Sequence, residues 1–184
     1  MRIKMKSYVQ TSKSSRRSAA ALLMFLYSLL LTNQVTAGMF GFFEFHDVHL
    51  SPEIEGIVTL KGHPLSNVVI TRELTYGKEY LDKTVTDVEG RFSMPAVNIR
   101  SQIPGKPLDE TRNRQVIVAE HEGKKYVLWY AVTDSIKPEI SVVEKLEYMN
   151  CELSKSEKLQ HFTKQENPSF THNIHSVCRW DGND

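Results

Sequence analysis

Short runs in which apolar and polar residues alternate follow one another along most of the chain. β-Branched and apolar residues dominate Ile54–Leu60 and Val68–Leu74, and turn residues follow each run. Phe92 and Met94 lie two positions apart, so they share one face of a further short strand that ends before Pro95. A period of two predicts β-strands rather than helices in this part of the chain.

A hairpin is predicted between Gln115–Ala119 and Lys125–Val132, because a short polar stretch with Gly123 separates these two β-rich runs. In the second run, bulky residues occupy both alternating sets of positions. This pattern is typical of a strand in the interior of a packed sheet.

The pattern is weaker after Pro138. Residues 142–153 are compatible with a strand or a short helix, and residues 153–165 are polar with helical propensity. A last strand is expected at 170–180. About seven short strands separated by regular turns favour an all-β Greek-key β-sandwich with a short C-terminal extension.

The first 37 residues differ from the rest. They contain six basic and no acidic residues, an apolar run at 19–31, and small residues at 35–37. The apolar run of about 13 residues is shorter than the roughly 20 that a membrane span needs. We therefore expect a signal peptide at 1–37, export to the periplasm or secretion, and no stable membrane span after cleavage. A translation start at Met39 is the alternative, and it would make the protein cytoplasmic.

Removal of this leader changes the charge of the chain. The full sequence has 23 Lys and Arg against 22 Asp and Glu, and residues 38–184 have 17 against 22. A mildly acidic chain lacks the basic surface that phosphate binding requires, so nucleic acid is not an expected partner. The remaining length suits one domain, predicted at 53–184. The aromatic segment 38–52 before it would pack as a first strand or bind a partner surface.

The two cysteines, Cys151 and Cys178, are expected to form a disulfide in an exported chain. Closing this loop would stabilise the fold by about 3–4 kcal/mol on the chain-entropy model. Two buried free thiols are the alternative, and they become the preferred interpretation if translation starts at Met39.

Residues 56–95 carry a motif of glycines, prolines and alternating apolar positions. Its matching positions are Gly56-x-Val58, Gly62-x-Pro64-Leu65, Val68-x-Ile70 and Thr86-Asp87-x-x-Gly90-x-Phe92-x-Met94-Pro95. The motif resembles the carboxypeptidase regulatory-like domain, one of the transthyretin-like (prealbumin-like) sandwiches. Asn67 stands where family members often have Gly, and Asn also tolerates a left-handed backbone.

A longer pattern resembles an uncharacterised bacterial family of unknown function that is built on this core. The pattern adds the Phe-rich start, Leu50-Ser51-Pro52, Leu128-Trp129 and the paired cysteines. The resemblance implies a sandwich scaffold and no particular activity, because this scaffold serves many functions.

The stretch Asp87-Val-Glu-Gly90 does not match a calcium-binding loop. Such a loop needs more alternating oxygen ligands and a closing Glu, whereas Arg91 occupies the next ligand position after Glu89 here. We therefore predict a tight turn in which Asp87 accepts backbone N–H bonds and Gly90 supplies a positive φ. A second structural turn is predicted at Pro64.

Two histidine pairs, His46 with His49 and His172 with His175, have i,i+3 spacing. On strands this spacing directs the two rings to opposite faces, so each pair alone is a poor chelate. The pairs could combine across the fold to bind zinc or copper. Surface or half-buried histidines are the simpler interpretation, and no metal or cofactor is predicted.

No catalytic set can be assigned. The Tyr-Arg-Gly-Ser tail of the transthyretin-like 5-hydroxyisourate hydrolases is replaced by Arg179-Trp-Asp-Gly-Asn-Asp184. The spacing of two Tyr and two His that intradiol dioxygenases use for iron is missing, as is any local nucleophile signature.

We therefore predict a non-catalytic exported binding module whose partner is another protein. The alternatives are an immunity or accessory factor for a secreted toxin, and a metal- or small-molecule-binding protein that uses the histidine pairs. The long connection Pro95–Arg114 is the segment expected to make the contacts, followed by the polar insert Leu153–Pro168, because binding residues concentrate on long loops.

Overall fold

The computed structural model describes residues 27, 44–106, 109 and 112–180 of the chain. The chain divides into two compact units, Met1–Glu44 and Phe45–Asp184. The predicted signal peptide, apart from Tyr27, and the alternative start at Met39 lie outside the described residues. No helix among the described residues has the length and apolar character that crossing a bilayer requires.

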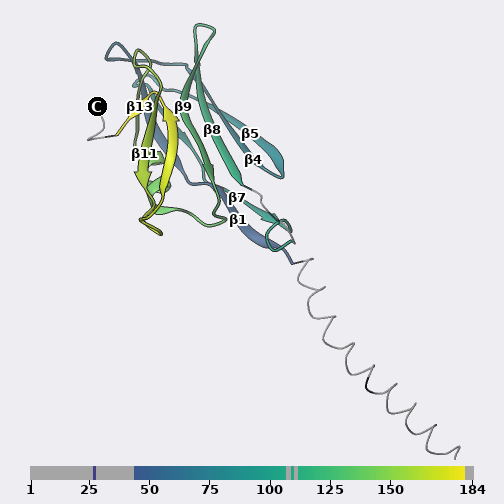
Figure 1. Cartoon of the computed structure of the whole chain (residues 1–184). Coiled ribbons are helices and arrows are strands. Elements are labelled where there is room, and N and C mark those ends of the chain that lie inside the picture. The colour runs from purple at the N-terminus through teal and green to yellow at the C-terminus, as the bar shows by residue number, and fades with distance from the viewer. Residues whose placement is uncertain (1–26, 28–43, 107–108, 110–111, 181–184) are drawn as a thin grey trace, which may run out of the picture. The chain divides into compact units, whose positions relative to one another are not determined.

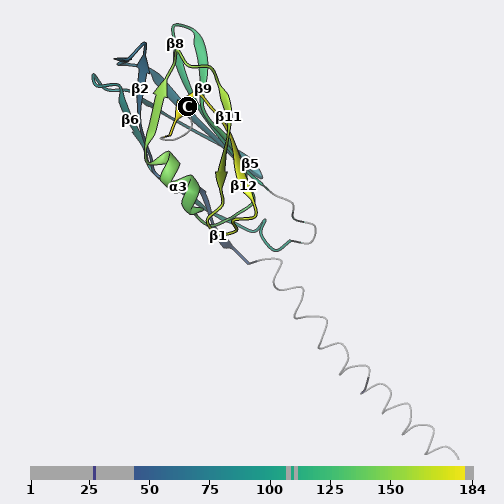
Figure 2. The ribbon, with the colours of Figure 1, turned by 60° about the vertical axis from the view of Figure 1, so that its left-hand side comes forward.

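The described part of the second unit is an all-β sandwich (Figure 1), as predicted, with thirteen strands instead of about seven and one short helix, α3 (Ile140–Leu146). What we call the large sheet has the order β11 (Lys158–Thr163), β12 (Thr171–Ser176), β9 (Lys124–Thr133), β8 (Asn113–His121), β4 (Val69–Tyr76) and β5 (Lys78–Val85). The small sheet has the order β13 (Cys178–Arg179), β10 (Met149–Glu152), β2 (Ile54–Leu60) and β3 (His63–Pro64), and β6 (Arg91–Met94) also pairs with β2. A separate two-stranded sheet, which we call the ribbon, consists of β1 (His46–Ser51) and β7 (Val97–Ser101). In Figure 2, β2 and β6 lie on one side of the sandwich, and β11 and β12 lie on the other.

Successive side chains of a strand point to opposite faces of the sheet, so burial alternates along each strand. In β4, every second residue is buried and the residues between are half-buried. In β9 the alternation is broken, because Ile117 pairs with Trp129 while Val118 pairs with Val127. The extra residue, Leu128, forms a bulge, so Leu128 and Trp129 are both fully buried although they are consecutive.

The buried apolar residues form two separate clusters. The main core lies between the large and small sheets and includes Val58, Ile70, Trp129 and Leu146. The second cluster consists of Val48, Leu50, Leu74 and Tyr76, with partly buried residues of β5, β7 and two loops around it. The ribbon covers this second cluster, at the end of the sandwich away from the β8–β9 turn (Figure 1).

Buried polar side chains separate the two clusters, and we call this group the polar seam: Ser51, Arg72, Asn113, Gln115 and Thr133. Arg72 is fully buried, donates from Nε to Asp82 Oδ1 (2.9 Å), and donates from Nη1 to Ser51 Oγ (3.1 Å) and to the Pro95 carbonyl (2.9 Å). The amide groups of Asn113 and Gln115 both donate to the Leu50 carbonyl at 2.7 Å. The seam thereby joins β1 to the large sheet.

Two segments differ from the prediction. Residues 97–101, expected within a long surface connection, form β7, because Val97 and Ile99 pack on the second cluster and β7 pairs with β1. Residues 158–163, expected to favour a helix, form β11, because pairing with β12 buries Gln160 and Phe162 and overrides local propensity. The region 142–153 contains both elements that the sequence allowed, with α3 ending at Leu146 and β10 beginning at Met149.

Candidate functional site

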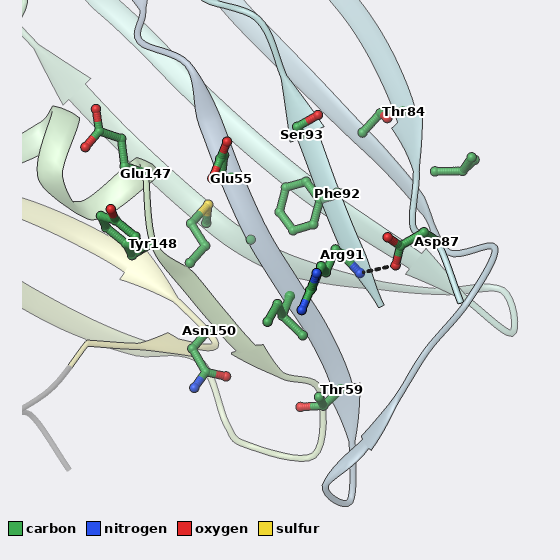
Figure 3. Close-up of a pocket in the computed structure, with 14 residues that line it drawn as sticks. Glu55, Thr59, Thr84, Asp87, Arg91, Phe92, Ser93, Glu147, Tyr148 and Asn150 are labelled. Atoms are coloured by element: carbon green, nitrogen blue, oxygen red, sulfur yellow. Dashed lines mark hydrogen bonds between the residues drawn. The ribbon is translucent and has the colours of Figure 1, made fainter. Parts of the chain in front are cut away.

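A groove of about 910 Å³ runs over the outer face of the small sheet, and we call it the small-sheet groove (Figure 3). Its floor comes from β2, β6 and β10, and its sides come from the segment before β10 and the end of β5. It lies on neither of the loops that sequence reasoning favoured for contacts.

The pairing register determines which side chains share the floor. Ile57 on β2 is paired with Arg91 on β6 and, in parallel, with Asn150 on β10. The next residue, Val58, is fully buried, so the side chain of Ile57 faces outward, where it is 40 % exposed. One row across the sheet therefore presents a cation, an aliphatic side chain and an amide.

Gly56 is required because the side chains of Phe92 and Met149 lie close to its Cα beneath the groove. A Cβ at this position would lie 2.6 Å from Cε1 of the Phe92 ring and 2.9 Å from Cβ of Met149. A side chain here would displace Phe92 from the main core. The first glycine of the sequence motif is thus explained by packing, with no chemical role.

The turn between β5 and β6 forms one side of the groove. Asp87 Oδ1 accepts hydrogen bonds from the backbone N–H groups of Glu89 (2.9 Å) and Arg91 (2.8 Å; Figure 3). Gly90 has a φ of 73°, and a Cβ there would lie 2.5 Å from the Val58 carbonyl oxygen. The carboxylate of Asp87 is thus engaged by the backbone, and the turn directs Arg91 into the groove.

The turn between β2 and β3, at Lys61 and Gly62, is fixed by a carboxylate that sequence reasoning missed, and Pro64 follows this turn in β3. Glu152 accepts hydrogen bonds from the backbone N–H groups of Lys61 and Gly62, both at 2.8 Å, and from Ser154. Burial alone would raise the pKa of Glu152, but the hydrogen bonds from Ser154, Gly62 and Lys61 lower it to about 2. Lys61 and Gly62 have φ values of 52° and 78°, so this turn carries a left-handed backbone at a non-glycine residue.

The groove contains charges without partners. Among the described residues, the side chains of Glu55, Glu147 and Arg91 take part in no hydrogen bond or ion pair. Figure 3 shows Glu55 and Glu147 toward one end of the groove and Arg91 closer to Asp87 and Thr59. Tyr148, between the two carboxylates and Asn150, is 75 % exposed. The groove therefore combines separated charges of both signs with an exposed aromatic ring.

The histidines do not converge. His172 is 3 % exposed and faces inward, whereas His175 lies on the opposite face of β12 with Nδ1 3.3 Å from Glu157 Oε1. His46 and His49 lie on β1, where His49 Nδ1 is 2.8 Å from Asn98 Oδ1. No group of three or more His, Cys, Asp or Glu side chains among the described residues has an arrangement that could bind a metal ion.

Buried charges gather where α3 begins. Glu139 Oε1 lies 3.3 Å from Lys164 Nζ and 3.5 Å from His172 Nε2, and Lys164 also contacts Asp134 at 2.7 Å. Burial lowers the pKa of His172, an effect that Glu139 partly offsets. Lys164 pairs with both carboxylates, so this cluster joins the start of α3 to the β11–β12 hairpin.

Cys151 and Cys178 form a disulfide between directly paired positions of β10 and β13. Both residues are fully buried in the main core. The bond closes the loop that contains the β11–β12 hairpin, and it lies at the side of the small sheet opposite β6.

A family model described as a domain of unknown function (DUF6795) matches residues 54–156, which is more than half of the chain. The match contains every residue that lines the small-sheet groove, but it excludes β1, β11, β12 and β13. None of the curated proteins and none of the solved structures compared with this chain matches it significantly.

Proposed function

The chain belongs to the DUF6795 family of domains of unknown function, and we propose that it is a non-catalytic, exported binding module that binds a segment of another protein in the small-sheet groove. One observation carries this proposal. Apolar side chains that are exposed, Ile57 and Tyr148, share the groove with charged side chains that have no partner in the described structure.

Export and scaffold are parts of the same proposal. The basic and apolar leader at 1–37 and the buried disulfide support an oxidising, non-cytoplasmic compartment. A carboxypeptidase regulatory-like scaffold is supported by its motif glycines, because Gly56 makes room for Phe92 and Gly90 has the left-handed backbone of a turn. On this scaffold the groove lies on a rigid sheet face.

The composition of the groove favours a polypeptide as the occupant. Tyr and Arg are the residue types that most often dominate protein–protein binding energy when a partner covers them. Arg91 lies on β6 and Tyr148 directly precedes β10, and these two strands flank β2, the strand that carries Ile57. A chain segment lying across the floor would cover Ile57. It would present an acidic group to Arg91 and a basic group to Glu55 and Glu147, which gives the complex a fixed orientation.

Site-specific photocrosslinking in the producing cell tests the proposal. A photoreactive phenylalanine analogue replaces Tyr148, and the matched control carries the same analogue at Leu159, which is 47 % exposed on β11 at the far edge of the large sheet. We expect one discrete adduct from position 148 only, and we expect Ile57→Asp to abolish it while circular dichroism stays unchanged. Equal adducts from both positions, or none from position 148, would contradict the proposal.

A further inference from the structure

A small cavity lies where the ribbon meets the large sheet. Its volume is about 10 Å³. It is lined by His49 of β1, Asn113 and Gln115 of β8, Thr133 of β9, and residues of the connection between β9 and α3, Glu139 among them. The cavity thus borders the polar seam between the two hydrophobic clusters.

Two of the residues that line this cavity each have a buried side-chain atom with no hydrogen-bond partner among the described residues: Asn113 Oδ1 and His49 Nε2. Asn113 is 2 % exposed, and its Nδ2 donates to the Leu50 carbonyl at 2.7 Å. That bond fixes the orientation of the amide, because a carbonyl can only accept. Asn113 Oδ1 is therefore a buried acceptor without a donor.

The histidine presents an acceptor as well. His49 Nδ1 lies 2.8 Å from Asn98 Oδ1, and an amide oxygen accepts, so Nδ1 carries the proton in the neutral ring. The lone pair is then on Nε2, the unpartnered atom. Since two acceptors cannot satisfy each other, the site needs a molecule with two donors.

We propose that one ordered water molecule occupies this cavity and donates one hydrogen bond to His49 Nε2 and one to Asn113 Oδ1. A water needs about 10–15 Å³ of such space and two to four polar partners, and the cavity meets both requirements. The water removes the desolvation penalty of two buried acceptors at once.

A monovalent cation fits the site less well. Glu139 is the acidic side chain that lines the cavity, and its carboxylate is already paired with Lys164 at 3.3 Å. An imidazole nitrogen is also a poor ligand for sodium, which prefers oxygen. The two unpartnered acceptor atoms therefore favour a neutral molecule that can donate two hydrogen bonds, such as water.

The water would be part of the attachment of β1. His49 and Leu50 belong to the segment before the family match, and Asn113 belongs to the matched region. The direct bonds from Asn113 and Gln115 to the Leu50 carbonyl would be extended by a bridge one residue away. The ribbon would then be joined to the large sheet through hydration as well as through side chains.

The test is a crystal structure of the oxidised protein at a resolution that shows ordered water, together with water-proton relaxation dispersion in solution. We expect a density peak within about 3.2 Å of both His49 Nε2 and Asn113 Oδ1. In solution we expect one fewer long-lived water in His49→Phe than in the wild type. His175→Phe is the matched control, because it makes the same substitution at a histidine that does not line the cavity, and it should keep the long-lived water.

An empty cavity in the wild-type crystal structure would overturn the proposal. So would a peak surrounded by several oxygen atoms at about 2.4 Å, which identifies a metal cation. The wild-type crystal structure is decisive by itself, even if His49→Phe does not fold.

Discussion

The main core and the second cluster share strand β4 of the large sheet but are stabilised differently. The main core contains the buried disulfide and an aromatic group in which Trp180 packs edge-on against Trp129 (5.9 Å between ring centroids) and Phe162 (5.4 Å). The second cluster has no covalent link among the described residues, and it depends on the ribbon to cover it.

The polar seam should allow the two clusters to open separately. Arg72, Asn113 and Gln115 interrupt the apolar contact between the clusters, so each apolar group can be exposed without exposing the other. Segments with few apolar contacts and with hydrogen bonds to side chains open at lower free energy than a core. We therefore expect the ribbon to open locally, and the main core to unfold as the cooperative unit.

Removal of the disulfide should produce the largest loss of stability, and the main core should be the part that is destabilised. Cys151→Ala with Cys178→Ala should lower the free energy of unfolding by about 3–4 kcal/mol, because the unfolded loop is no longer closed. Urea denaturation measures this change. Native-state hydrogen exchange should show an unchanged local opening free energy for the amides of the ribbon.

Reduction provides the control for that variant. A reductant should destabilise the wild type by a similar amount and leave the double variant unaffected. A double variant that loses protection in the ribbon as strongly as in the main core would show that the two clusters are one cooperative unit.

Leu50→Ala should have the opposite distribution of effects: it should destabilise the ribbon and leave the main core almost unchanged. Leu50 is fully buried in the second cluster, so its truncation should cost about 3 kcal/mol, detected by hydrogen exchange as easier opening of β1 and β7. The urea midpoint monitored by tryptophan fluorescence should change much less, because Trp129 and Trp180 both lie in the main core. Leu81→Ala, at a position that is 57 % exposed on β5, is the control and should stay within about 0.5 kcal/mol of the wild type. A fluorescence transition shifted by the full amount would show that the two clusters do not unfold independently.

Glu152 should give the smallest effect, which depends on pH. Glu152→Gln should lower the free energy of unfolding at neutral pH by about 1–2 kcal/mol, because charge-assisted bonds to Lys61 and Gly62 are weakened. The folded-state pKa of about 2 lies below the ordinary value of 4.5, so this stabilisation is fully present above about pH 4.5 and disappears as the pH falls through 2.

Urea denaturation of wild type and variant between pH 2 and pH 7 tests this, and the two curves should converge toward pH 2. Glu53→Gln, at an exposed carboxylate, serves as the control and should show no such convergence. A constant difference across this pH range would mean that the Glu152 carboxylate does not stabilise the turn.

Local signals were sufficient for the all-β class. The alternation in β4 and the spacing of Phe92 and Met94 directly reflect which faces are buried. β7 and β11 were missed, because each is a strand only through its partner: β1 lies some 50 residues before β7, and β12 supplies the pairing that overrides helical propensity in β11.

The groove could not be predicted for the same reason. It depends on the parallel pairing of β10 with β2, which places Asn150 beside Ile57, and no local pattern specifies that register. Glu152 was missed because its donors, Lys61 and Gly62, lie about 90 residues earlier in the chain. The turn residues Asp87 and Gly90 act within a few positions of themselves, and such features can be recognised from the sequence.

The place of the disulfide has a consequence for a chain that has been cut. Cys151 and Cys178 flank the β11–β12 hairpin, so a protease that cleaves the turn at 164–170 leaves two fragments still joined by a covalent bond. The shorter fragment carries β12, β13 and Trp180, and it stays paired with β9 and β10 through the sheets. Cleavage at this turn would therefore leave the main core intact. Gel electrophoresis would separate the two fragments only after the disulfide has been reduced.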